Sequence, residues 1–97
     1  MNEREKLFRR VVLEEAETVL REQAGRVEKL SDALNLKLAE YVKLIYGELL
    51  NSSEIFAKIF VYTHLHKTFE ENHVEEVKSE ARKEVQRILS RDERLFL

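Results

Sequence analysis

The sequence contains no cysteine and no proline, and its 97 residues include only two glycines, Gly25 and Gly47. Without cysteine the chain forms no disulfide, offers no thiolate nucleophile and builds no cysteine metal site. Two separated glycines also exclude a glycine-rich phosphate-binding loop. The remaining composition, dominated by Glu, Lys, Arg, Leu and Val, predicts helices joined by short connections.

Long apolar runs and an excess of one charge are missing as well. The formal net charge is −2 and both signs are interspersed, so no overall field recruits nucleic acid or an anionic membrane. No apolar run approaches the roughly 20 residues of a membrane span, and the charged opening MNEREKLFRR does not resemble a signal peptide. We therefore expect a soluble, cytoplasmic protein with a single domain over residues 1–97. The same charged composition would suit a thermophile.

Apolar residues recur every three or four positions, which is the period of an amphipathic helix. In the first helix Asn2 is the expected cap, and the apolar stripe runs from Phe8 to Leu30. This stripe passes Gly25, so the helix either continues through the glycine or ends there with the glycine as its C-terminal cap. We expect a break or kink near residues 24–26.

The second and third helices are expected on either side of residues 51–53. Ser31 or Asp32 is the expected cap of the second helix, whose apolar residues extend to Leu50. Asn51 and Glu54 have the spacing of a capping box that opens the third helix. One long helix through this point is the alternative, because the apolar positions stay nearly in phase across it.

The third helix, residues 54–70, is apolar on almost every side and is therefore predicted to be the most buried. Asn72 and Glu75 repeat the capping spacing and open a last helix, which ends in an apolar tail at residues 95–97. The fold class is therefore all-α. We expect an antiparallel bundle of four principal helices, or five if the first helix breaks near Gly25.

The large apolar residues exceed what four short helices can cover, which predicts self-association. We expect a non-enzymatic helical interaction module, a homodimer or a binder of another protein, with no cofactor and no catalytic residues. The candidate interface residues are Tyr46, Leu50, Phe56, Phe60, Leu95, Phe96 and Leu97.

The segment LSDALNLKLAEYVKLI, residues 30–45, resembles the helix-turn-helix of small transcriptional regulators. The resemblance implies that Asn35 is the turn residue and that the second helix enters the major groove of DNA. It also implies buried positions at Leu30, Ala33, Leu34, Leu36, Tyr41 and Ile45. Only Lys37 and Lys43 are basic on the implied reading face, which also carries Leu38, Glu40 and Val42. DNA binding is thus the alternative function.

A third possibility is metal binding by His66, Glu70 and His73, which are spaced by four and three residues and would share one helix face. The alternative is a hydrogen-bonded core position for His66 and solvent exposure for the other two. The chain lacks HExxH, and only Glu70 to His73 has the Glu-x-x-His spacing of di-iron bundles.

Overall fold

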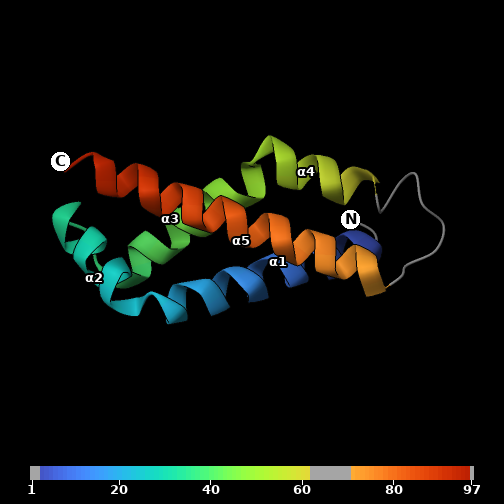
Figure 1. Ribbon diagram of the computed structural model, residues 1–97, viewed down its shortest axis with the longest axis horizontal. Coiled ribbons are helices and arrows are strands. Elements are labelled where there is room, and N and C mark those ends of the chain that lie inside the picture. The colour runs from blue at the N-terminus through green and yellow to red at the C-terminus, as the bar shows by residue number, and fades with distance from the viewer. Residues whose placement is uncertain (1–2, 62–70, 97) are drawn as a thin grey trace.

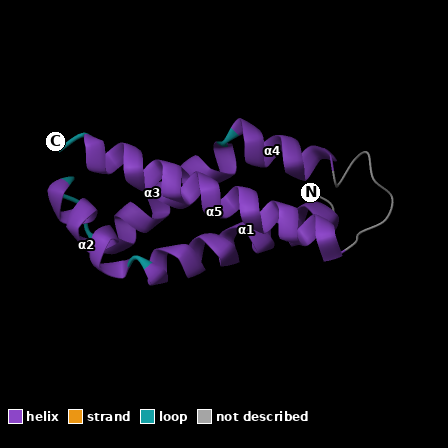
Figure 2. Cartoon of the chain, viewed as in Figure 1, coloured by secondary structure: helices purple, strands orange, loops and turns teal. Residues whose placement is uncertain are grey.

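The structure is a computed structural model that describes residues 3–61 and 71–96, with side chains from residue 73 onward in the second range. These residues form five helices and no strand, so the predicted all-α class is confirmed (Figures 1 and 2). The helices are α1 (Glu3–Glu22), α2 (Ala24–Ala33), α3 (Leu38–Asn51), α4 (Ser53–Phe60) and α5 (Glu71–Arg94).

The five helices build three rods along a molecule of 45 × 22 × 19 Å. The first rod is α1 with α2 bent over its end, the second is α3 followed by α4, and the third is α5 alone (Figure 1). The second rod runs antiparallel to the other two, so α1 and α5 run in the same direction. The predicted helical bundle is confirmed, and the described residues form the five helices that were expected if the first helix breaks near Gly25. Successive rods are antiparallel, so the first and third rods run parallel to each other (Figure 1).

The first rod breaks at Gln23, close to the expected position, but not through the glycine. Gly25 lies in the first turn of α2 and does not have a positive φ, so it is not a left-handed C-terminal cap. Helix α2 instead ends at Ala33, and the backbone reverses through Asn35, whose φ is 61°. Asparagine tolerates this left-handed conformation better than most residues.

Two predicted caps are wrong for a local reason. Ser31 is buried inside α2 and donates a 2.8 Å hydrogen bond from its hydroxyl to the carbonyl oxygen of Glu28, so it does not open a new helix. At the second break Asn51 is the last residue of α3, and the extended Ser52 (φ −62°, ψ 131°) is the N-cap, with no side-chain cap hydrogen bond. The break also excludes one long helix. The described part of α5 starts at Glu71, so the expected cap Asn72 lies within the helix.

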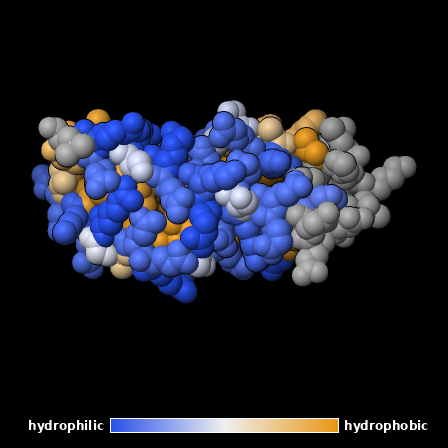
Figure 3. Space-filling model, viewed as in Figure 1, coloured by the Kyte–Doolittle hydropathy of each residue, from blue (hydrophilic) through white to orange (hydrophobic). Residues whose placement is uncertain are grey.

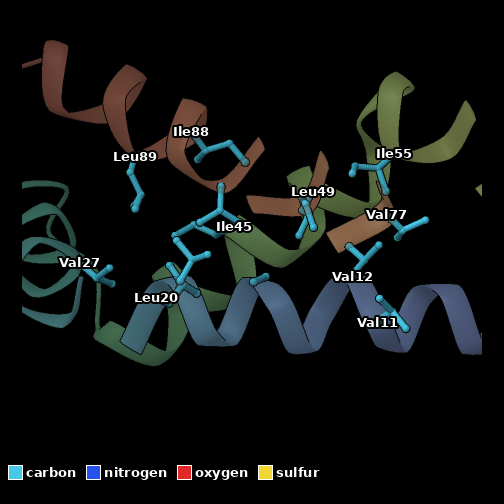
Figure 4. Close-up of a cluster of buried hydrophobic side chains, with 14 of the residues drawn as sticks. Val11, Val12, Leu20, Val27, Ile45, Leu49, Ile55, Val77, Ile88 and Leu89 are labelled. Atoms are coloured by element: carbon cyan, nitrogen blue, oxygen red, sulfur yellow. The ribbon is translucent and has the colours of Figure 1, made fainter. Parts of the chain in front are cut away.

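The core lies between α1 and α5 and is closed by the inner sides of α3 and α4 (Figure 4). The apolar side chains that are fully or almost fully buried are Phe8, Val11, Val12, Ala16, Val19, Leu20, Val27, Leu30, Tyr41, Ile45, Leu49, Ile55, Ile59, Val77, Ala81, Val85, Ile88 and Leu89.

The described part of the predicted central helix is not the most buried element. In α4 only Ile55 and Ile59 are buried, while Phe56 and Phe60 are 57% and 44% exposed. With three rods, α4 has neighbours on its inner side alone, and its outer side stays open. Residues 62–70 of this segment lie outside the described residues.

Candidate interaction surface

Ion pairs join α5 to each of the other helices. Among the described residues, every ion pair between two helices has one partner on α5. These pairs are Arg82 with Glu15 (2.9 Å) and Glu22 (2.8 Å), Arg26 with Glu93 (2.6 Å), Arg91 with Glu48 (2.9 Å) and Lys58 with Glu76 (3.7 Å). On the face seen in Figure 3, where α5 crosses the front, hydrophilic residues cover most of the surface.

The contact between α1–α2 and α3 has a different character, and we call it the α1–α3 seam. Its α3 side is a stripe of residues spaced by four, Leu38, Val42, Tyr46 and Leu50. Two hollows of about 380 and 300 Å³ open along it, and Tyr46 and Glu17 line both of them. Leu13 lines the first hollow; Leu20, Val27, Leu38 and Val42 line the second. The seam is therefore an apolar groove between two rods.

Tyr46 lies at the middle of the seam and reaches towards α1. Its ring is half-buried and packs against the core. Burial raises the pKa of its hydroxyl, and the nearby Glu17 carboxylate raises this pKa further while Arg21 lowers it. Glu17 and Arg21 form an ion pair on α1. The phenol is thus neutral, with an apolar ring between the hollows and a polar end beside α1.

Phe56 and Phe60 extend the apolar surface beyond Leu50. Lys58 pairs with Glu76 and so marks the side of α4 that faces α5. Viewed down the helix axis, Phe56 and Lys58 lie on opposite sides of the buried Ile55. Phe60 lies one turn beyond Phe56 on the same side. Both rings therefore lie on the side away from α5, where α1 is the other neighbour of α4.

The exposed apolar area of this surface can be compared with the area that a protein–protein contact buries. Leu38, Phe56 and Phe60 are 44%, 57% and 44% exposed, and Leu13, Val42, Tyr46 and Leu50 are half-buried. With on the order of 200 Å² per large side chain, these seven residues expose roughly 400 Å². One partner of a standard interface contributes about 800 Å², of which a little more than half is apolar. The surface thus offers the apolar area that one side of a stable interface requires.

Of the predicted interface residues, Tyr46 and Leu50 lie on the α3 stripe, and Phe56 and Phe60 lie on α4, which follows α3 in the same rod. Leu95 and Phe96 are 67% and 50% exposed but lie past the end of α5, and Leu97 lies outside the described residues. Leu13, Leu38 and Val42 belong to the surface although they were not predicted to. The spacing of residues 38, 42, 46 and 50 is the sequence signal that could have identified two of them.

A second groove, between α3 and α5, contains a buried polar network. It is a hollow of about 250 Å³ lined by Leu34, Leu36, Tyr41, Leu44, Ile45, Glu48, Ile88, Arg91 and Asp92. Tyr41 donates a 2.7 Å hydrogen bond to Oδ2 of Asp92, and Arg91 donates to Oδ1 of Asp92 at 2.9 and 3.1 Å. Arg91 also pairs with Glu48. Because these charges satisfy one another, we assign the network to holding α3 against α5.

The helix-turn-helix resemblance is matched by the backbone better than by the charges. The turn at Asn35 is confirmed, and Leu30, Tyr41 and Ile45 are buried, whereas Ala33 is exposed. Lys37 and Lys43 are both exposed, but Lys37 is the extended N-cap of α3 (ψ 148°), whereas Lys43 lies inside the helix, so the two lysines are not on one helix face. The two lysines therefore do not build one phosphate-binding face.

His66 and Glu70 of the predicted metal site lie outside the described residues, and His73 is half-buried near the start of α5. No cluster of three metal-ligating side chains occurs within residues 3–61 and 73–96. None of the described helices combines the length and apolar character needed to cross a bilayer. Searches of protein-family models, curated proteins and solved structures find no match to the chain.

Proposed function

We propose that the chain is a non-enzymatic interaction module that associates with a copy of itself by burying the α1–α3 seam and the adjoining phenylalanines of α4. The observation that carries the proposal is that the helix contacts differ in character. Ion pairs join α5 to its neighbouring helices, whereas the α1–α3 seam presents half-buried apolar side chains. Apolar patches of a few hundred Å² are often functional, and interaction with another protein chain is one such function.

The mechanism is burial of a few large anchors. Phe56 and Phe60 supply most of the exposed aromatic area, and Tyr46 supplies a ring with a polar end, the residue types that dominate interface energetics. Charged residues of α1 line the hollow beside Tyr46, and they disfavour partners that carry a like charge at the opposing position.

A matched pair of variants on α3 tests this function. Leu38 lies on the seam and is 44% exposed, and Leu44 lies on the other side of the same helix and is 53% exposed. In sedimentation and light-scattering measurements we expect the wild type to be a dimer, Leu38→Glu to shift it towards monomer, and Leu44→Glu to leave it dimeric. A monomeric wild type, or a Leu38→Glu variant that stays dimeric, would contradict the proposal.

DNA binding through residues 30–45 is the second proposal, and the left-handed turn at Asn35 is the observation in its favour. Its test is an electrophoretic mobility-shift measurement with duplex DNA. We expect a salt-sensitive shift that disappears when Lys37 and Lys43 are both changed to Gln. If the protein does not change the electrophoretic mobility of duplex DNA at low salt, this function is excluded.

A further inference from the structure

The seam carries charges whose sign changes along α1. Lys6, Arg10, Leu13 and Glu17 follow one another at spacings of four, three and four, and all line the hollow beside Tyr46. Such spacings place the four side chains on one face of the helix. The residues before Leu13 on this face are basic, and the residue after it is acidic.

These charges are available to a partner. Lys6 and Arg10 are exposed and take part in none of the described ion pairs. The side chain of Glu17 keeps half of its surface exposed although it pairs with Arg21. A face that is basic on one side of Leu13 and acidic on the other is complementary to its own copy turned end for end.

We infer that the partner of the seam is a second copy of this chain, packed end for end about a two-fold axis at Leu13, with Arg10 of each protomer opposite Glu17 of the partner subunit. This inference rests on the proposed function and specifies its orientation. Arg10 lies three positions before Leu13 and Glu17 lies four positions after it. The two-fold rotation therefore brings Arg10 of one protomer to nearly the same height along α1 as Glu17 of the partner subunit, and the contact forms twice.

The same rotation orders the rest of the interface. Helix α1 faces α1 of the second copy and α3 faces α3, each pair antiparallel, which forms a four-helix bundle with antiparallel neighbours. On α3, Tyr46 and Leu50 then meet their counterparts. Gly47, whose added Cβ would meet nothing within 4 Å, leaves room for a close approach. Because both copies use one surface, association ends at the dimer.

Reversal of one charge tests the orientation. Arg10→Glu places two carboxylates together in both symmetric contacts, and Glu17→Arg places two guanidinium groups together. We expect each variant alone to raise the dimer dissociation constant roughly tenfold or more, and less at high salt. Lys83→Glu, the same type of reversal at a 70% exposed side chain of α5, is the matched control and should dimerise like the wild type.

Mixing the two reversed variants is the decisive measurement. In the mixed pair, one contact would join the carboxylate introduced at position 10 of one chain to the guanidinium introduced at position 17 of the other. The native pair of Arg10 and Glu17 would form in the second contact. Arg10→Glu mixed with Glu17→Arg should therefore restore a dimer, which native mass spectrometry identifies as the mixed species. Restoration also demonstrates that both variants are folded, and circular dichroism of each variant alone checks their helicity.

The outcomes separate this inference from the proposed function. If Leu38→Glu dissociates the dimer but the mixed variants do not recombine, the seam is the interface and the end-for-end orientation is wrong. If both reversed variants dimerise like the wild type, the orientation is likewise wrong. If Leu38→Glu leaves the wild-type dimer intact, the proposed function itself fails.

Discussion

Tyr41 on α3 and Asp92 on α5 form a buried hydrogen bond of 2.7 Å that joins residues 51 positions apart. Tyr41 is 2% exposed and Asp92 is 5% exposed. A carboxylate in this position needs its partners, because a buried charge without hydrogen bonds is costly. Asp92 receives them from Tyr41 and from the adjacent Arg91. The contact therefore fixes how α3 lies against α5.

Tyr41→Phe should lower the free energy of unfolding by about 1–3 kcal/mol, because it leaves a buried carboxylate oxygen without its donor while keeping the ring. Urea unfolding at neutral pH measures the change. Tyr46→Phe is the control, since no described hydrogen bond holds the Tyr46 hydroxyl, and we expect a change within about 0.5 kcal/mol. Equal losses in the two variants would show that the network does not stabilise the fold.

Tyr41 should also make stability depend on pH in the alkaline range. Burial raises the pKa of its hydroxyl, and the hydrogen bond to Asp92 raises it further. A group whose pKa is raised on folding stabilises the protein below the unfolded pKa, about 10 for tyrosine, and this contribution is lost as pH rises above it. Urea midpoints should therefore fall more steeply above about pH 10 in the wild type than in Tyr41→Phe. Parallel curves would contradict this linkage.

The helical class and most of the helix positions could be predicted because they depend on local pattern. The stripe from Phe8 to Leu20 and the stripe from Val77 to Leu89 each keep one period, and both became helices with that side buried. The break at Gln23 was predicted within a few residues from the position of Gly25, although the glycine does not form the cap. Caps were predicted less well, because Ser31 and Asn51 can satisfy their side chains in more than one backbone conformation.

The interaction surface could be predicted only in part. Leu38 and Leu49 are both apolar residues of the α3 pattern, yet Leu49 is completely buried and Leu38 is 44% exposed in a groove. That difference depends on how many rods surround α3, which no local pattern contains. The burial of Asp92 was not predicted, although residue 92 continues the spacing of Val85 and Ile88.

Arg82 joins α5 to α1 by pairing with Glu15 and Glu22, and its removal should destabilise the bundle. Hydrogen bonding to Arg82 lowers the pKa of Glu22. A lowered pKa stabilises the fold above the unfolded value of about 4.3, and this stabilisation is lost as pH falls through the folded value. Arg82→Met should therefore lower the thermal midpoint at pH 7 and reduce its decline between about pH 5 and pH 3.

The neighbouring Lys83 provides the control for Arg82. Its side chain is 70% exposed and pairs only with Glu80 on its own helix among the described residues, so Lys83→Met should change the midpoint less. The difference between wild type and Arg82→Met should also shrink in concentrated salt, because screening weakens exposed pairs. A difference that is independent of both salt and pH would mean that the aliphatic part of Arg82, and not its charge, packs the helices together.

Gly47 lies inside α3 with no positive φ and with nothing within 4 Å of an added Cβ. Gly47→Ala should therefore raise the free energy of unfolding of the monomer by about 1 kcal/mol through helix propensity alone. Gly25→Ala in the first turn of α2 is the matched control with a smaller expected gain. Urea unfolding at several protein concentrations separates fold from assembly. If the gain holds in dilute solution and reverses only where the chain is dimeric, the added methyl group meets the partner subunit at α3.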